Sequence, residues 1–152
     1  MGMISEFKDF IAKGNAIVKE HFEFLNIITK ISFSDALNKD ILAQGELMST
    51  KLFCCYLEHQ GQDHLLLPAL DFMVLDQNEE PNLQLIRSKL NTLLAAHTDK
   101  KIFITQGYIC KNVRGEVDNL KRGGSDYTAS LVAAACNASV CEIWTDIDGM
   151  HN

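Results

Sequence analysis

The sequence predicts an α/β protein in which a mostly parallel sheet lies between helices. Three observations favour this class: amphipathic helical patterns fill the first part of the chain, apolar β-rich strings follow, and helical patterns separate those strings. The chain has 152 residues, 47% of them hydrophobic, which fits one compact domain or a piece of one. We expect a helical subregion over about 1–60 and an α/β subregion over about 61–152.

Apolar residues at three- and four-residue intervals predict the helices of the first subregion. Residues 3–29 carry an amphipathic pattern with an expected break at Gly14-Asn15, which would give two helices or one kinked helix. A second, long helix is expected from about Ser34 to His59, and Gly61 suits its end.

Strand and helix patterns alternate in the second subregion. In chain order they are an apolar strand within 64–76, a helix opened by Pro81, a strand at 101–110, a polar loop at 111–124, a helix at 125–138 and a strand at 140–146. This order is typical of parallel strands joined by helical crossovers.

The net negative charge disfavours nucleic acids and anionic membranes as partners. Twenty acidic and fourteen basic residues give a formal net charge of -6, which repels nucleic-acid phosphates and anionic membrane surfaces and favours small polar ligands. No apolar run reaches the roughly 20 residues that span a bilayer. The charged N-terminal stretch does not resemble a signal peptide, so we expect a cytosolic protein.

Cysteine and histidine spacing predicts no metal site. Cys54 and Cys55 lie in an apolar helical pattern and are interpreted as small buried hydrophobes, while Cys110, Cys136 and Cys141 have no second ligand at zinc-site intervals. The five histidines form no HExxH pattern, and neither a GxxxxGK[ST] loop nor a GxGxxG string is present.

The string from Arg122 to Thr128, RGGSDYT, is the strongest candidate site in the sequence. Paired glycines before a helix let backbone N–H groups approach an anion, and Arg122 could add a bidentate contact to a carboxylate or phosphate. From these residues alone, Ser125 or Asp126 could instead cap the helix, and Arg122 could be a solvated loop charge.

Two further carboxylate positions have functional and structural interpretations. Thr145 and Asp146 follow the last predicted strand, where open α/β sheets bind ligands, but an Asp-Gly turn explains the same residues. Glu46 borders a dense apolar helix face, where it could hold a ligand amine or remain solvated.

Four ordered motifs together resemble the aspartate kinase family. They are QGELMST at 44–50, ITQGYI at 104–109, RGGSDYT at 122–128 and IWTDIDG at 143–149. The resemblance implies the amino-acid kinase (carbamate kinase-like) fold and transfer of the ATP γ-phosphoryl group to the β-carboxylate of L-aspartate, with Mg²⁺ bridging the phosphates. That reaction is the first step of lysine, threonine and methionine biosynthesis.

The same resemblance implies roles for individual residues. Glu46 would bind the substrate ammonium group, Arg122 a substrate carboxylate, and Asp126 would orient the amine. In full, the implied substrate-binding residues are Glu46, Arg122, Gly123, Ser125 and Asp126, and the implied nucleotide-binding residues are Thr145 and Asp146.

The chain also departs from the family pattern. Nothing in residues 1–40 resembles the family's Lys-Phe-Gly-Gly-Thr-Ser stretch, so the catalytic cation is unassigned, and the sequence ends at Asn152 before the family's regulatory domains. Lys121 stands where glycine is common, and Gln44 where histidine or a small residue is common. We therefore expect a central fragment of a catalytic domain that is inactive alone.

Two consequences follow from this interpretation. Loss of a strand from the parallel sheet would expose unpaired backbone groups and apolar side chains, so we expect self-association or a rearranged sheet. The alternatives are a non-catalytic module that binds small anions or amino acids, and another amino-acid kinase relative acting on glutamate, carbamate or a nucleotide.

Overall fold

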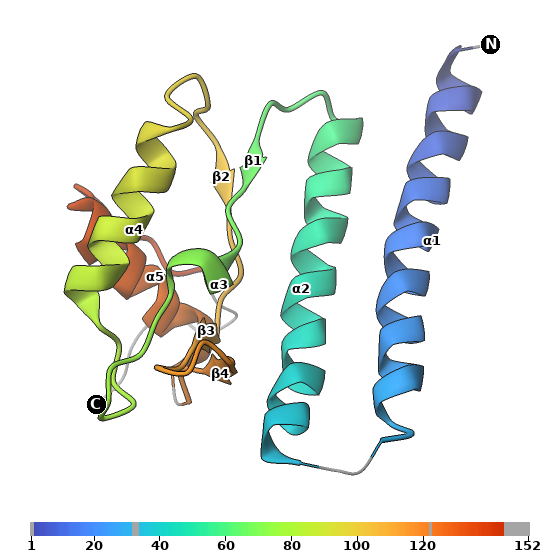
Figure 1. The fold of residues 1–152 in the computed structure, drawn as a ribbon. Helices are drawn as coiled ribbons and strands as arrows, with labels where there is room; N and C mark the ends of the chain where they lie inside the picture. The colour runs from blue at the N-terminus through green and yellow to red at the C-terminus, as the bar shows by residue number, and fades with distance from the viewer. Residues whose placement is uncertain (1, 32–33, 122, 145–152) are drawn as a thin grey trace.

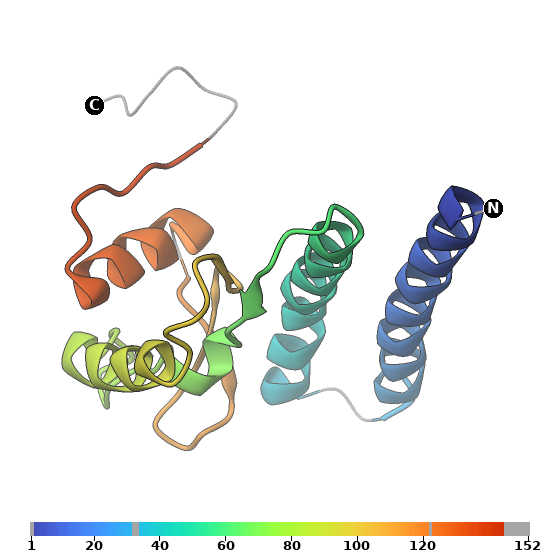
Figure 2. The ribbon, with the colours of Figure 1, turned by 90° about the horizontal axis from the view of Figure 1, so that it is seen from above.

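The fold is a layered arrangement of helices around short strands (Figure 1). The computed structural model describes residues 2–31, 34–121 and 123–144, with side chains from residue 6 onwards. The elements are α1 (Gly2–Ile28), α2 (Asp35–His59), β1 (Leu65–Leu66), α3 (Ala69–Phe72), α4 (Leu83–Ala95), β2 (Phe103–Ile104), β3 (Ile109–Lys111), β4 (Val117–Asn119) and α5 (Gly124–Cys136). Seen from above, α1 and α2 lie on one side of the strands and α4 and α5 on the other (Figure 2).

The first two helices form an antiparallel pair. Ion pairs join them at Lys13–Glu58 (2.8 Å) and Lys51–Glu20 (2.9 Å). The expected break at Gly14-Asn15 is wrong, because α1 continues through it. A methyl group on Gly14 would lie 3.9 Å from the Leu52 side chain, so this glycine faces α2. Packing against α2 outweighs the low helix propensity of glycine.

The ends of the helices follow local capping chemistry. The Ser34 side chain accepts a hydrogen bond from the Leu37 N–H and starts α2 at Asp35. The Asn82 side chain does the same for Leu85, so α4 begins at Leu83, two residues after Pro81. The chain turns at Gly61 with φ 66°, just beyond α2.

The strands form two small sheets. β1 and β2 pair in parallel, with Leu65 opposite Phe103 and Leu66 opposite Ile104. β3 and β4 form an antiparallel hairpin, so the loop expected over 111–124 is wrong at Val117–Asn119. The Asn112 side chain accepts hydrogen bonds from the N–H groups of Arg114 and Glu116 and closes the hairpin turn.

The last predicted strand is not formed over residues 140–144. These residues have no regular secondary structure, and Trp144 is 90% exposed. The remainder of that predicted strand, Thr145 and Asp146, lies outside the described residues. The α/β class is therefore confirmed, with a parallel pairing much shorter than expected.

The main core lies between α3, α4 and β3. Phe72, Met73, Ile86, Ile109 and Cys110 are fully buried there. They come from α3, the residue that follows it, α4 and β3, so the core joins the helices to the start of the hairpin. Among the described helices, none combines the length and the hydrophobicity that a membrane span requires.

Candidate functional site

The start of α5 is built mostly from exposed residues, Gly123, Ser125 and Asp126. Gly123 precedes the helix with φ 82°, a left-handed conformation that glycine adopts without strain, and Gly124 follows with φ 36°. Ser125 and Asp126 lie inside the first turn, so the interpretation that one of them caps the helix is wrong. Within the described part of the chain no side chain caps this end, which leaves its N–H groups able to meet an anion.

A close backbone contact joins the ITQGYI and RGGSDYT motifs. A methyl group added at Gly107 would lie 2.8 Å from Ser125 Cβ and 2.9 Å from Ser125 Cα, so only glycine fits there. The neighbouring Tyr108 N–H donates to Thr128 Oγ1 at 2.9 Å, and that hydroxyl donates to the Gly124 carbonyl at 3.1 Å. The start of α5 is thus held against the chain that follows β2.

Tyr108 itself adopts a strained backbone conformation at this contact. Its φ is 67°, in the left-handed region that costs a residue with a side chain about 1–2 kcal/mol. Its N–H bonds to Thr128, and its carbonyl accepts from the Leu120 N–H at 2.8 Å. These two hydrogen bonds hold the conformation in place, as is typical of strained positions at functional sites.

A buried glutamine joins the GELMST motif to the same region. Gln106 is 1% exposed, and its Nε2 donates to Thr50 Oγ1 at 2.9 Å. The Thr50 hydroxyl donates to the Glu46 carbonyl at 2.8 Å. Through these bonds the turn of α2 that carries Glu46 is connected to the chain leading to Gly107.

The implied site residues fall into three groups in the structure. Glu46 is half-buried on α2. Gly123, Ser125 and Asp126 are exposed at the start of α5. The remaining residues, Arg122, Thr145 and Asp146, lie outside the described residues.

Sequence reasoning missed the residues that hold the site together. Gln106, Gly107, Thr50 and Thr128 received no role, although each belongs to one of the quoted motifs. A polar residue inside an apolar string, such as Gln106 in ITQGYI, is the signal that could have drawn attention to them.

The loop before Arg122 is held by an ion pair. Lys121 has φ 56°, which explains why glycine is common at this position in the family that the motifs resemble. Its Nζ lies 2.7 Å from Glu79 Oε2, and its N–H donates to Asn119 Oδ1 at 3.0 Å. The hydrogen bond between the charged groups raises the pKa of Lys121 and lowers the pKa of Glu79.

Burial disfavours the reactive thiolate form of three of the cysteines. Burial raises the pKa of the Cys110 thiol to about 12, and burial also raises the pKa of Cys54 and of Cys136. No cluster of three histidine, cysteine, aspartate or glutamate side chains suited to a metal occurs among the described residues.

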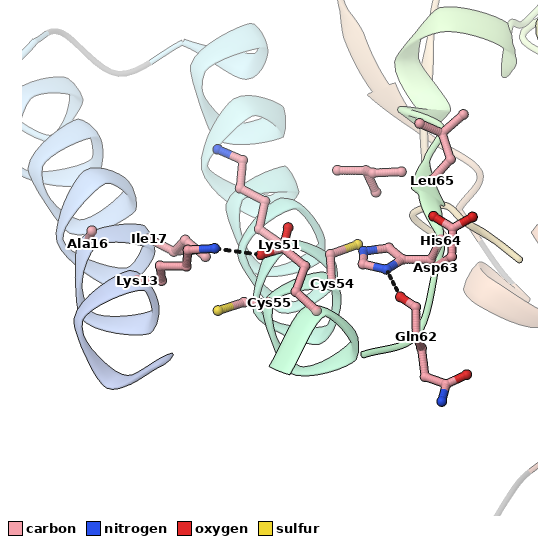
Figure 3. Close-up of a pocket in the computed structure, with 12 residues that line it drawn as sticks. Lys13, Ala16, Ile17, Lys51, Cys54, Cys55, Gln62, Asp63, His64 and Leu65 are labelled. Atoms are coloured by element: carbon pink, nitrogen blue, oxygen red, sulfur yellow. Dashed lines mark hydrogen bonds and ion pairs between the residues drawn. The ribbon is translucent and has the colours of Figure 1, made fainter. Parts of the chain in front are cut away.

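A hollow of about 710 Å³ lies between α1, α2 and the segment 62–66 (Figure 3). Its charged groups have partners of their own: Lys13 pairs with Glu58, and Lys51 with Glu20. The His64 Nδ1 donates to the Gln62 carbonyl at 2.9 Å. No motif residue lines this hollow, so the candidate site lies elsewhere.

Comparison with known proteins identifies the family. The sequence model of the amino acid kinase family matches residues 3–152. The chain belongs to this family. Among its relatives, the lysine-sensitive aspartokinase 3 of Escherichia coli is 32% identical over 135 residues, which are 87% of this chain and 30% of that protein. The aspartokinase of Chlamydia muridarum is 31% identical over 156 residues, which cover 98% of this chain and 35% of the relative.

Solved structures agree with this family assignment. Aspartokinase III of Escherichia coli in complex with aspartate and ADP superposes with a TM-score of 0.79 at 30% identity, over 87% of this chain and 31% of that chain. The resemblance to aspartate kinases and the expected amino-acid kinase fold are therefore confirmed. This member of the family spans about a third of the length of the relatives that it matches.

Proposed function

We propose that this chain is part of an aspartate kinase, which transfers the γ-phosphoryl group of ATP to the β-carboxylate of L-aspartate. The aspartokinase relatives support this proposal, as does the related structure in complex with aspartate and ADP. One observation carries it: a hydrogen bond joins the α2 motif to ITQGYI, and a hydrogen bond and a glycine contact join ITQGYI to the uncapped start of α5. The backbone amides of that start suit an anionic substrate group.

In this proposal the chain's own residues bind and orient the amino acid. The Glu46 and Asp126 carboxylates suit the substrate ammonium group, and Arg122 suits a carboxylate through a bidentate contact. Gly123 and Ser125 form the helix start that faces the anion. Together these groups match a zwitterion with an extra carboxylate, which is the chemistry of aspartate.

The nucleotide side of the site rests on the resemblance alone. Thr145 and Asp146 are proposed to contact ATP. Mg²⁺ would neutralise charge on the phosphates during transfer. The described residues contain no cluster of three metal-binding side chains, so we propose that the nucleotide phosphates supply most of its ligands. A cytosolic location and a homo-oligomeric or self-associating state belong to the same proposal.

Calorimetric titration with L-aspartate tests the substrate site. We expect saturable binding that is at least tenfold weaker in Arg122→Ala and in Glu46→Gln, since each variant removes a charged hydrogen bond. Arg114→Ala and Glu23→Gln are matched controls, because Arg114 lies at the hairpin turn and Glu23 is exposed on α1. These controls should bind as the wild type does.

The other outcomes separate the alternatives. A preference for L-glutamate would favour another amino-acid kinase relative. Binding of unrelated small anions as tightly as L-aspartate would favour a non-catalytic binding module, because lack of acyl-phosphate formation is expected of this chain in either case. Equal affinity in the wild type and in all four variants would contradict the assigned site.

A further inference from the structure

Gln106 is a buried amide with both of its polar ends in use. Its Oε1 accepts a hydrogen bond from the Ala69 N–H at 2.8 Å, at the first residue of α3. Its Nε2 donates to Thr50 Oγ1 at 2.9 Å. A buried side chain that both accepts and donates orders the two elements that it joins, because breaking either bond leaves a polar group unpaired in the core.

The Thr50 hydroxyl links Gln106 to the backbone of α2. It has one proton to donate, and Gln106 already donates to its oxygen, so the proton is directed to carbonyls of its own helix. Those carbonyls are Glu46 O at 2.8 Å and Leu47 O at 3.2 Å. The Gln106 amide thereby sets the direction of a hydrogen bond that ends on the backbone of Glu46.

On its other side, Gln106 leads directly into the contact with α5. Gly107 follows it and touches Ser125 backbone and side-chain carbons. Tyr108 comes next and is bonded to Thr128. Anchoring Gln106 in the core therefore also anchors the surface against which the start of α5 rests.

We infer that Gln106 is a positioning residue of the aspartate site. It fixes the turn of α2 that carries Glu46 relative to the start of α5 that carries Asp126, and it touches no substrate. The inference rests on the proposed function, since it assigns both carboxylates to one ligand. Other side chains of similar size cannot make both hydrogen bonds. An ionised glutamate can accept but cannot donate, and leucine can do neither.

The variant Gln106→Glu tests this through its pH dependence. A protonated glutamic acid has the shape of glutamine, accepts from Ala69 and donates to Thr50, so L-aspartate should bind within about twofold of the wild type. Once ionised, the carboxylate turns the Thr50 hydroxyl toward itself and away from Glu46. Affinity should then fall about tenfold relative to the wild type as the pH rises from 5 to 8.

Comparing the affinity of Gln106→Glu with that of the wild type at each pH isolates the effect of the side chain at position 106. Glu46 on α2, Asp71 on α3, Asp126 on α5 and Tyr108 beside Gln106 are titratable in both proteins, so the wild-type profile subtracts their effects. In a Thr50→Val background the hydroxyl is absent, and Gln106→Glu should add no pH-dependent loss. The inference would be overturned if the ratio of wild-type to Gln106→Glu affinity stayed constant with pH. It would also be overturned if the pH dependence of that ratio persisted in the Thr50→Val background.

Amide hydrogen exchange tests the positioning role of Gln106 without any added ligand. Between pH 5 and 8, Gln106→Glu should lower protection relative to the wild type at 46–50 and at 125–128 together, while α1 near residues 15–20 is unchanged. Protection that falls in only one segment, or in neither, refutes the positioning role. Absence of aspartate binding to the wild type, by contrast, refutes the proposed substrate site of this chain, and exchange still decides the role of Gln106 in joining α2 to α5.

Discussion

At the scale of single residues, glycine and cysteine positions show how the local environment decides a side chain's effect. Gly45 and Gly107 both belong to family motifs, yet their surroundings differ. A methyl group at Gly45 would meet no atom within 4 Å, whereas at Gly107 it would collide with Ser125. The contact between two motifs therefore requires glycine at position 107, whereas no steric constraint requires it at position 45.

Gly107→Ala should destabilise the protein by about 1–3 kcal/mol, because the added methyl group forces the chain away from Ser125. Gly45→Ala is the matched control and should stabilise it by about 0.5–1 kcal/mol, since alanine favours the interior of α2. Urea unfolding measures both free energies. Equal effects of the two substitutions would contradict the close contact.

The buried Cys110 thiol predicts a loss of stability at alkaline pH. Its pKa is raised from 9.0 to about 12 in the folded protein, so the native state holds this proton more tightly than the unfolded chain. The stabilisation is complete below pH 9 and is lost as the pH rises toward 12, by at most about 1.4 kcal/mol per pH unit. In urea unfolding, the free energy of unfolding of Cys110→Ala should decline less steeply over that pH window than that of the wild type. Equal declines in the two proteins would argue against the raised pKa.

At the scale of elements, one ion pair joins α2 to the β3–β4 hairpin. Lys39 Nζ lies 2.6 Å from Asp118 Oδ2, and the Asp118 side chain is only 7% exposed. The hairpin also donates a hydrogen bond, from the Lys111 N–H to the Met73 carbonyl, which joins it to the core. The polar hairpin therefore depends on partners that are distant in the sequence.

Lys39→Met should cost about 1–3 kcal/mol of stability, because it leaves the Asp118 carboxylate buried without its cation. Lys19→Met is the matched control: Lys19 is exposed and pairs only with the exposed Glu23, so its loss should change stability by less than about 0.5 kcal/mol. Thermal or urea unfolding compares the two. A Lys39 variant as stable as the Lys19 variant would mean that the pair adds nothing.

At the scale of the whole molecule, apolar side chains remain exposed along α1 and α2. Phe7, Ile11 and Phe22 lie on α1, and Phe53 and Tyr56 on α2, all of them substantially exposed. Within the described chain, the β1–β2 sheet has only two strands, so each strand has one edge without a strand partner. Exposed apolar surface and open sheet edges both favour association.

We expect the chain to self-associate, with a mean mass that rises with protein concentration in light scattering. Sulfate should strengthen the association, because it favours burial of apolar surface. Replacing Phe22 and Phe53 with serine should weaken it, while the control substitution of the exposed Lys8 with serine should not. A monomer that persists at every concentration and sulfate level would contradict this prediction.

Sequence reasoning succeeded where the signal is local. The ends of α2 follow from Ser34 and Gly61, and the helix from about 125 follows from its small-residue pattern; α5 indeed spans Gly124–Cys136. Four ordered motifs were enough to predict the family, because their combined spacing is far more specific than any one of them. The roles of Glu46, Ser125 and Asp126 remain predictions.

The errors arose where distant parts of the chain decide the outcome. Gly14 stays helical because α2 packs against α1, and β4 pairs with β3 in a hairpin whose Asp118 meets Lys39 of α2. Residues 140–144 have strand-like composition but no strand partner in the described chain, and composition cannot supply one.

By itself, then, the sequence determined the family, the positions of the long helices and the ends of α2, since these depend on spacing and on neighbours within a few residues. Only the tertiary structure revealed that Gln106 and Gly107 hold the motifs of α2 and α5 together. The physical reason is that a buried hydrogen bond and a backbone contact have no sequence period. They exist only once distant residues meet, as when Thr50 and Gln106, 56 positions apart, come within 2.9 Å.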